Sequence, residues 1–459
     1  MPHSGHTLSR KSFLAGALAG AAAVPFGMSL VEASDARARQ SGGPNVVLIL
    51  FDDLGYGDLS CYGSRAISTP NADRLASGGV RLTHAYSGAP VCTPSRAALM
   101  TGRYGARSGL QKTVSPGEAR GMPDGERTVA EYLRRAGYAT GCFGKWHLGS
   151  RPEHNPTRHG FDRFFGVLHS NDMEPFRLYD GEEVVESEVD QAQLTRRYTE
   201  QASAFIRENS AGPFFAYLPH TMPHIPIHAE ERFRGVSDAG PYGDAVEAID
   251  YYLGNLVAVL EDEEVLENTL ILLSSDNGPW FTGSTGGLRG RKGETYEGGM
   301  RVPTIVHWPA GIRGETVSGY PISFVDFLPT LCSLAGAEPD GDITLDGEDV
   351  SDALRGEPAG ERGPIYFFTE KHLNAVRRGR WKLHVRRKSE GGYDVTAQMP
   401  QLFDLESDSS ESYDLSSTRP EIVEELRSLL ERFEAEVNGD DSSQETDDQA
   451  FWRDWLPGL

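Results

Sequence analysis

The chain has 459 residues, with 67 acidic and 44 basic residues and a formal net charge of −23. This length allows one large α/β domain with a smaller appendage, or two or three ordinary domains. So acidic a surface would repel nucleic acid and anionic membranes, which argues against both as partners. If the substrate is an anion, a local cluster of basic groups must therefore receive it.

The first forty residues have the composition of an export signal. A basic segment at residues 9–14 (SRKSFL) is followed by an Ala/Gly-rich apolar run that extends to Leu30, with small residues beyond it. The run is weakly hydrophobic and contains Pro25, which disfavours a membrane span, and no cysteine follows it directly to carry a lipid anchor. The basic segment resembles a twin-arginine signal with Lys11 in place of the second arginine. We predict that residues 1–40 are signal and linker, and that the protein is exported to the periplasm or beyond.

Predicted strands and helices alternate along the next part of the chain. Thr128 and Glu131 form a capping box that opens a helix, which Gly137 ends. Apolar residues from Val246 to Leu260 follow helical spacing. Continuous apolar runs typical of strands buried on both faces occur at residues 45–51, 139–143, 213–218 and 269–275. This alternation predicts an α/β fold with a large mixed, mainly parallel sheet sandwiched by helices.

The pattern changes near Arg362. Short strands of a small antiparallel sheet are predicted at residues 365–368, 375–385 and 402–405, followed by a helix over residues 420–437. The last segment is acidic and lacks apolar periodicity. We therefore expect a main domain at residues 44–361, a C-terminal subdomain at 362–437 and an acidic tail at 438–459.

Two polar pairs directly follow predicted buried strands. Asp52 and Asp53 come after the strand at 45–51, and Asp276 and Asn277 come after the strand at 269–275. In open α/β sheets, ligands bind outside the carboxyl ends of the strands. Either pair alone could merely cap a helix or turn. Together they offer an all-oxygen ligand set, which suits calcium or magnesium better than zinc.

The four cysteines have a spacing that fits no zinc template, and they are too few for a disulfide scaffold, although a single bridge is compatible with the count. We interpret Cys61, Cys142 and Cys332 as small buried hydrophobic residues. Cys92 begins the segment CTPSRAALMTGR, which ends at Arg103. On spacing alone, this segment could be a turn with an incidental cysteine.

The segment from Cys92 to Arg103 resembles the signature of the sulfatase family, within the alkaline phosphatase superfamily. In that family, Cys-x-Pro-x-Arg directs oxidation of the cysteine to formylglycine. Further matches occur in family order between Pro44 and Leu405: DDLGYGD at 52–58, GKWHLG at 144–149, HGFD at 159–162, SDNG at 275–278 and KGETYEGG at 292–299. Similarity to arylsulfatases and N-acetylgalactosamine-6-sulfatases is greatest, so the resemblance implies hydrolysis of a sulfate monoester, with a sulfated sugar as natural substrate.

The resemblance also implies a metal site and a nucleophile. One calcium ion would be bound by Asp52, Asp53, Asp276 and Asn277. Cys92 would be converted by a formylglycine-generating enzyme, and its hydrate would attack sulfur to give a covalent sulfated enzyme. Loss of a proton from the second hydroxyl of the hydrate would then expel sulfate.

Basic residues take the remaining roles that the resemblance implies. Arg96 would stabilise the formylglycine, and Lys145 and Lys292 would hold sulfate oxygens. His147 would be the base that starts sulfate release. The acid that protonates the leaving oxygen would be His224, whose His-x-Pro spacing matches the family. His220 lies in the same loop, and the sequence does not exclude an exchange of roles between these two histidines.

Two alternatives remain at this level. A phosphatase or phosphonate-ester hydrolase of the same superfamily shares the metal and sometimes the nucleophile, but the segments that carry Lys145, His147 and Lys292 favour sulfate. A non-catalytic binder of sulfated glycans would keep Cys92 as a thiol, but no expected catalytic position is missing. The choice of sugar would depend on loops such as residues 169–173.

Overall fold

The computed structural model describes residues 43–312, 314–386 and 399–438. The predicted export signal lies outside these residues, as does the predicted acidic tail apart from residue 438. No helix in the described ranges is both long enough and apolar enough to cross a membrane. The described residues belong to one compact unit that begins at Gly42.

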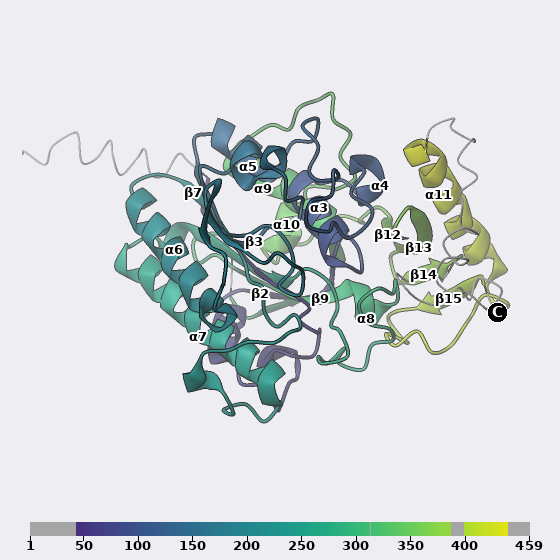
Figure 1. Ribbon diagram of the computed structural model, residues 1–459. Coiled ribbons are helices and arrows are strands. Elements are labelled where there is room, and N and C mark those ends of the chain that lie inside the picture. The colour runs from purple at the N-terminus through teal and green to yellow at the C-terminus, as the bar shows by residue number, and fades with distance from the viewer. Residues whose placement is uncertain (1–42, 313, 387–398, 439–459) are drawn as a thin grey trace, which may run out of the picture. The chain divides into compact units, whose positions relative to one another are not determined.

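An 11-stranded mixed sheet forms the centre of the main domain (Figure 1). Its strands are β1 (Asn45–Phe51), β2 (Val80–Tyr86), β3 (Ala139–Lys145), β4 (Arg163–Val167), β5 (Leu178–Asp180), β6 (Glu183–Glu186), β7 (Phe214–Pro219), β8 (Thr269–Ser275), β9 (Arg301–His307), β10 (Thr316–Ser318) and β11 (Ile322–Ser323). The strand order is β10-β2-β9-β8-β1-β7-β3-β4-β5-β6, and β11 also pairs with β2. The five neighbours β8, β1, β7, β3 and β4 are parallel, whereas β9 runs antiparallel to β8 and β2. The predicted mixed, mainly parallel sheet is confirmed.

Helices cover both faces of this sheet (Figure 1). The helices of the described residues are α2 (Pro70–Ser77), α3 (Cys92–Thr101), α4 (Gly105–Ser108), α5 (Val129–Arg135), α6 (Leu194–Asn209), α7 (Gly240–Asp262), α8 (Glu297–Met300), α9 (Phe327–Ala335), α10 (Ser351–Leu354) and α11 (Pro420–Asn438), with short 3₁₀ turns between them. The capping box predicted at Thr128 and Glu131 is present at the start of α5. Gly137 follows this helix with a φ of 90°, a left-handed conformation that suits glycine.

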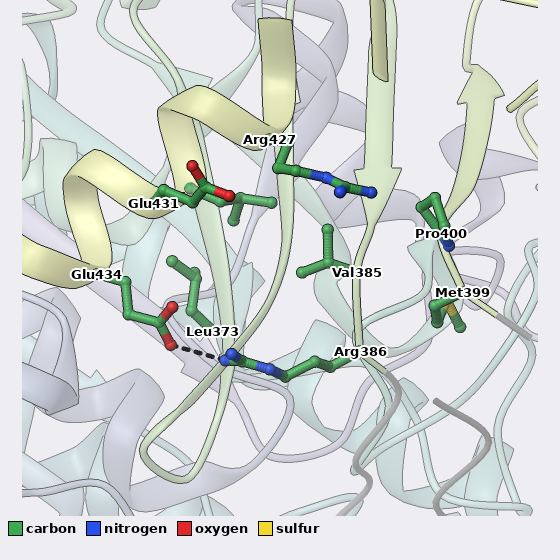
Figure 2. A pocket seen from close by; sticks show the side chains of 9 residues that line it. Leu373, Val385, Arg386, Met399, Pro400, Arg427, Glu431 and Glu434 are labelled. Atoms are coloured by element: carbon green, nitrogen blue, oxygen red, sulfur yellow. Dashed lines mark hydrogen bonds and ion pairs between the residues drawn. The ribbon is translucent and has the colours of Figure 1, made fainter. Parts of the chain in front are cut away.

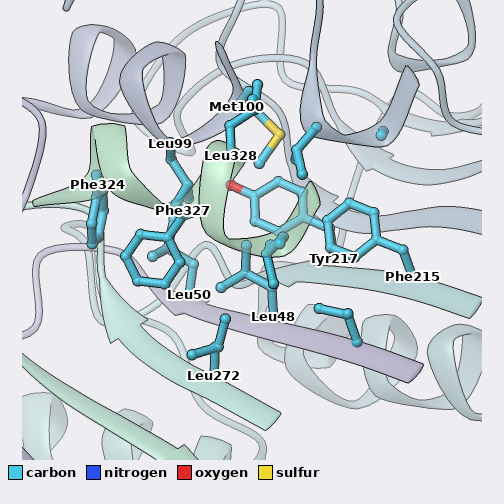
Figure 3. Packing of buried hydrophobic residues seen from close by; sticks show 14 of the residues in the cluster. Leu48, Leu50, Leu99, Met100, Phe215, Tyr217, Leu272, Phe324, Phe327 and Leu328 are labelled. Carbon is cyan, nitrogen blue, oxygen red and sulfur yellow. The ribbon is translucent and has the colours of Figure 1, made fainter. Parts of the chain in front are cut away.

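The alternation of side chains along β1 separates two hydrophobic layers. Leu48 and Leu50 pack in the layer that contains α3, α5 and α9, where Figure 3 shows them beneath Leu99 and Leu328. The intervening residues, such as Ile49, face the layer that contains α2, α6 and α7. Because both faces are buried, every residue of β1 is apolar apart from Asn45.

The C-terminal part forms a four-stranded antiparallel sheet with the order β12-β13-β14-β15. Its strands are β12 (Ile365–Thr369), β13 (His372–Arg378), β14 (Trp381–His384) and β15 (Gln401–Asp404). The prediction of one strand over 375–385 is wrong, because the chain reverses at Gly379 and Arg380 and divides the run between β13 and β14. The turn lies within the polar run at residues 377–380, and Gly379, with a φ of 55°, marks it.

Helix α11 packs on this small sheet, and a pocket of about 340 Å³ lies between them (Figure 2). Leu373 and Val385 line it from the sheet, and Arg386 forms an ion pair with Glu434 of α11 at 2.7 Å. None of the residues that line this pocket is among the predicted site residues.

The buried strand β1 provides a test of the core. We expect Val47→Ala to lower the free energy of unfolding by about 2 kcal/mol, because it removes apolar contacts and leaves a cavity. Val236→Ala is the matched control, since this valine is 60% exposed whereas Val47 is fully buried. Its effect should stay within about 0.5 kcal/mol. Equal effects of the two changes in urea denaturation would contradict the assignment of Val47 to the core.

Candidate active site

The predicted site residues meet at one edge of the large sheet, because five parallel strands end there. Phe51 of β1 pairs with Ser275 of β8, so that Asp52 and Asp276 leave the sheet at the same level. The Asp276 amide donates to the carbonyl of Phe51 at 3.0 Å, which continues the pairing one step beyond the strands. Strand β3 ends at Lys145, and the loop after β7 carries His220 and His224. This geometry is the one that the strand-end pairs predicted.

Cys92 is the first residue of α3 and is buried beside charged groups of both signs. Its Sγ lies 3.6 Å from an oxygen of Asp52, 3.7 Å from Nζ of Lys145 and 3.4 Å from Nζ of Lys292. The positive end of the helix dipole adds to this field. Burial, followed by the charge of Asp276, raises the pKa of the Cys92 thiol well above its usual value. An unmodified thiol here is therefore protonated and a poor nucleophile.

All four cysteines are free thiols. Cys142 and Cys332 are buried, which confirms their interpretation as hydrophobic residues. Cys61 is only half-buried, so the interpretation is wrong for this residue to that extent. Its backbone N–H donates to Asp73 at 2.8 Å, in the short 3₁₀ turn that precedes α2.

The polar pairs after β1 and β8 interlock. The amide N–H of Asp53 donates to Oδ1 of Asp276 at 3.1 Å, and Nδ2 of Asn277 donates to Oδ1 of Asp53 at 2.7 Å. Asp53 has a φ of 66°, which is uncommon for a residue with a side chain and turns the backbone sharply after β1. The buried Oδ1 of Asn277 accepts no hydrogen bond from the described residues. This unsatisfied oxygen is a feature expected of a ligand to a cation.

Several side chains around Cys92 place atoms that could bind a metal ion close to one another. Asp52, Asp53, Cys92 and His224 each place one such atom within 4.8 Å of the others. Asp276 is not in this group, and Nη2 and Nε of Arg96 both donate to its Oδ2, at 2.7 and 3.0 Å. The cluster can therefore hold a cation.

Three buried or nearly buried cations face the three carboxylates. Arg96 pairs with Asp276 and also donates from Nη1 to the carbonyl of Lys145 at 2.8 Å. Lys145 lies 2.5 Å from Asp52, and Lys292 lies 2.7 Å from Asp53. Burial opposes ionisation of Asp52, but Lys145, His224 and Arg96 together bring its pKa below the usual value. These cations provide the local basic groups that the acidic composition required, and each of them is paired with a carboxylate.

Two of the histidines considered in the sequence analysis, His147 and His224, lie in the site, whereas His220 lies apart from it. The ring of His147 is buried, with Nε2 3.2 Å from the carbonyl of Val114 and Nδ1 without a described partner. Burial, with Lys145 and Arg96 nearby, lowers the pKa of His147 well below its usual value, so the imidazole is neutral at pH 7. His147 has a φ of 57°, and its carbonyl accepts from Thr93 at 2.9 Å. That contact connects His147 to the helix that carries Cys92.

Two of the histidines after β7, His220 and His224, have different surroundings. His224 directs Nε2 toward Asp53 at 3.7 Å, while its Nδ1 lies 3.0 Å from Oδ1 of Asn171. His220 instead contacts the rings of Phe51 and Tyr198, and burial lowers its pKa to about 3. The structure therefore brings His224, and not His220, into the cluster.

The sequence analysis assigned the loop of residues 169–173 to the choice of sugar, but it did not foresee that two polar residues of this loop contact the catalytic groups. Ser170 accepts a hydrogen bond from Nζ of Lys145 at 3.1 Å, and Asn171 contacts His224 as described. Both follow β4, a parallel strand of five residues that the sequence analysis did not predict. Recognition of that strand would have placed the loop at the same sheet edge.

Family comparison agrees with this geometry. The family model described as sulfatase matches residues 44–337, which is more than half of the chain. The chain belongs to the sulfatase family. A second model, described as the C-terminal region of aryl-sulfatase, matches residues 360–458. The protein is thus a sulfuric ester hydrolase that acts on sulfated substrates.

Individual relatives extend over most of the sulfatase. N-acetylgalactosamine-6-sulfatase of Canis lupus familiaris is 38% identical over 74% of this chain and 71% of its own. Arylsulfatase A of Homo sapiens is 37% identical over 84% of this chain and 87% of its own. The crystal structure of Ps i-CgsB in complex with k-i-k-neocarrahexaose aligns with a TM-score of 0.79 at 32% identity, covering 91% and 98% of the two chains. These relatives support sulfate ester hydrolysis over the phosphate-ester and non-catalytic alternatives.

Proposed function

We propose that this sulfatase hydrolyses sulfate monoesters of carbohydrates through a formylglycine made from Cys92, with one calcium ion at the adjacent acidic cluster. The observation that carries this proposal is the position of Cys92 at the start of α3, with its Sγ within 3.7 Å of Lys145 and Lys292. A nucleophile at this point would have two ammonium groups ready to receive the oxygens of a sulfate group. The raised pKa of the thiol supports conversion, because an unmodified Cys92 would be a weak nucleophile.

The residues present fit a calcium ion. The proposed ligands Asp52, Asp53, Asp276 and Asn277 provide only oxygen atoms, which a hard divalent cation prefers. The buried Oδ1 of Asn277 has no described hydrogen-bond donor, and a cation would satisfy it. When bound, the ion supplies positive charge that offsets the carboxylates and attracts the sulfate group.

Each remaining group would have one task in the reaction. As the hydrate, residue 92 would supply one hydroxyl that attacks sulfur and displaces the alcohol. Loss of a proton from the second hydroxyl would then form the C=O bond of the aldehyde as the C–O bond to sulfate breaks. Lys145 and Lys292 would stabilise negative charge on the sulfate oxygens. Arg96 would stabilise the formylglycine and keep Asp276 in place through their ion pair. The neutral ring of His147, with Nδ1 unpartnered, can accept the proton that starts sulfate release.

His224 would protonate the leaving oxygen. Its Nδ1 side contacts Asn171, which leaves Nε2 directed at the cluster, 3.7 Å from Asp53. An alcohol leaving group of a sugar needs this proton more than an acidic phenol does. The acid role therefore distinguishes a carbohydrate substrate from an aryl sulfate.

The choice of a sulfated carbohydrate rests on the relatives. One is named as an N-acetylgalactosamine-6-sulfatase, and another was crystallised with a neocarrahexaose. We also propose that the protein is exported and that a separate enzyme converts Cys92. Conversion of Cys92 requires a formylglycine-generating enzyme, and a twin-arginine route would allow it before export of the folded chain.

The modification can be tested by mass spectrometry of the tryptic peptide from Leu82 to Arg96, from protein produced beside a formylglycine-generating enzyme. We expect the aldehyde mass in place of the thiol mass, and loss of sulfatase turnover in Cys92→Ala. Cys142→Ser is the matched control, since this buried cysteine should remain a thiol and dispensable for turnover. A peptide that keeps its thiol, in protein that still turns over, would refute the formylglycine.

Calcium binding can be measured without reference to activity. After chelation, added calcium should raise the melting temperature, because binding to the folded state at 100 times Kd contributes about 2.7 kcal/mol. Asn277→Ala should reduce this shift by removing the unsatisfied oxygen. A melting temperature that does not respond to calcium in the unsubstituted protein would contradict the proposed ligand set.

The acid role of His224 predicts a dependence on the leaving group. We expect His224→Ala to lower kcat for a sugar sulfate by about 10²–10⁴-fold, and much less for an aryl sulfate with an acidic phenol. His220→Ala serves as the control, because its ring packs against Phe51 and Tyr198 outside the cluster. Its effect should be the same for both substrates. Equal losses on both substrates in His224→Ala would exclude the acid role.

A further inference from the structure

The loop after β15 inserts an acidic side chain from the C-terminal sheet into the main domain. Glu411 is completely buried and has a φ of 52°, which is uncommon for a residue other than glycine. Its carboxylate accepts from the backbone N–H of Glu297 at 2.6 Å. It also lies 2.8 Å from Nε2 of His384 and 3.2 Å from Nζ of Lys382, both on β14. Glu411 therefore joins β14 to the start of α8.

The backbone of Glu411 makes a second contact with the main domain. Its carbonyl accepts a hydrogen bond from Nη1 of Arg289 at 2.7 Å. The guanidinium carbon of Arg289 lies 4.1 Å from the centre of the Tyr296 ring, and this ring contacts His384 at an interplanar angle of 32°, with centroids 4.6 Å apart. Arg289 is thus held by a carbonyl and by an aromatic face together.

Arg289 and Glu297 bracket the segment that carries Lys292. Between them the chain folds tightly, since Gly298 donates to the carbonyl of Arg289 at 2.6 Å. A Cβ at Gly298 would lie 2.3 Å from the carbonyl oxygen of Gly290, and this close approach requires glycine. Both ends of the segment 289–297 are therefore tied to Glu411.

The middle of this segment reaches the active site. Gly293 donates to the carbonyl of Pro90 at 2.9 Å, two residues before Cys92. The amide of Lys292 donates to Pro279 at 3.1 Å, and its Nζ lies 3.4 Å from Sγ of Cys92. A shift of the segment would move this ammonium group, because the lysine side chain projects from its centre.

A purely structural role for Glu411 would be to join the two sheets. The network around it suits that role, since Lys382 also bonds Glu297 at 2.8 Å. However, both contacts that Glu411 makes to the main domain fall on the segment around Lys292 and not on a strand of the large sheet. The contacts therefore restrain an active-site segment as well as the sheet.

We propose that Glu411 is a positioning residue of the C-terminal sheet that acts on catalysis through Lys292, by fastening residues 289–297. The inference rests on the proposed role of Lys292 in holding sulfate. It predicts that the C-terminal subdomain is required for full sulfatase turnover although it supplies no group that touches the nucleophile.

The test is a double-mutant cycle between Glu411 and Lys292. Glu411→Gln should lower kcat/KM for a sulfate ester by about 10–100-fold, since small misplacements of a reacting group have effects of this size. In the Lys292→Ala background the same change should have almost no further effect, because the group it positions is absent. Equal losses in both backgrounds would show a general structural role and overturn the inference.

A second variant guards against misfolding. Arg289→Met removes the bond to the Glu411 carbonyl but leaves the buried carboxylate and its partners in place. It should reproduce the same loss and the same lack of additivity. Glu434→Gln is the matched control, because this α11 residue pairs with Arg386 and has no described contact with residues 289–297, so it should leave kcat/KM unchanged. Inhibition by inorganic sulfate should weaken in Glu411→Gln and Arg289→Met, whereas it should be unchanged in Glu434→Gln.

The outcomes separate this inference from the proposed function. If Lys292→Ala loses turnover but Glu411→Gln and Arg289→Met do not, the positioning role fails and the site assignment stands. If Lys292→Ala keeps full turnover, the role of Lys292 fails and the inference falls with it.

Discussion

The balance of buried charge at the edge of the parallel sheet governs the rest of this structure. Three carboxylates, those of Asp52, Asp53 and Asp276, lie out of water within a few ångströms of one another. Each would be costly alone, because removing an ion from water carries a large desolvation penalty. Each has a cation at 2.5–2.7 Å, provided by Lys145, Lys292 and Arg96. The site is thus nearly neutral as a whole, in a chain whose net charge is −23.

The paired charges come from segments that are far apart in the sequence, and the fold must bring these segments together. The cations come from α3, from the end of β3 and from the segment before α8, so no single element contains a complete pair. Each ion pair therefore also acts as a tertiary contact. Arg96 shows this most clearly, because its guanidinium spans Asp276 and the carbonyl of Lys145.

The C-terminal sheet repeats the same principle on the other side of α8. Glu297 and Glu411 are buried beside Lys382, and Arg301 and Arg377 complete the surroundings through Glu297 and Tyr86. Buried ionic groups of this kind favour one arrangement of two parts over others, since any shift leaves a charge unpaired. The position of the small sheet relative to the main domain therefore depends on these buried ionic groups.

Much of the fold followed from local sequence signals. The strands at 45–51 and 269–275 were predicted with their observed bounds, because long apolar runs between polar ends leave little choice of conformation. The capping box at Thr128 was equally local. By contrast, β2 and β9 were not predicted. In β2, apolar residues are interspersed with polar ones, and β9 contains Pro303. The two strands pair with each other, and β9 also pairs with β8, so their conformation depends on the tertiary fold.

The sequence by itself determined the residue types of the site and their place after the predicted strands, because an apolar run between polar residues is a local signal. Its motifs also indicated the family. Only the tertiary structure decided which groups meet: it brought His224 rather than His220 to the cluster, added Ser170 and Asn171 through an unpredicted short strand, and tied Glu411 to the segment of Lys292 across more than 100 residues. Such contacts depend on how separate elements pack, and side-chain packing is a property of the folded chain that no local pattern specifies.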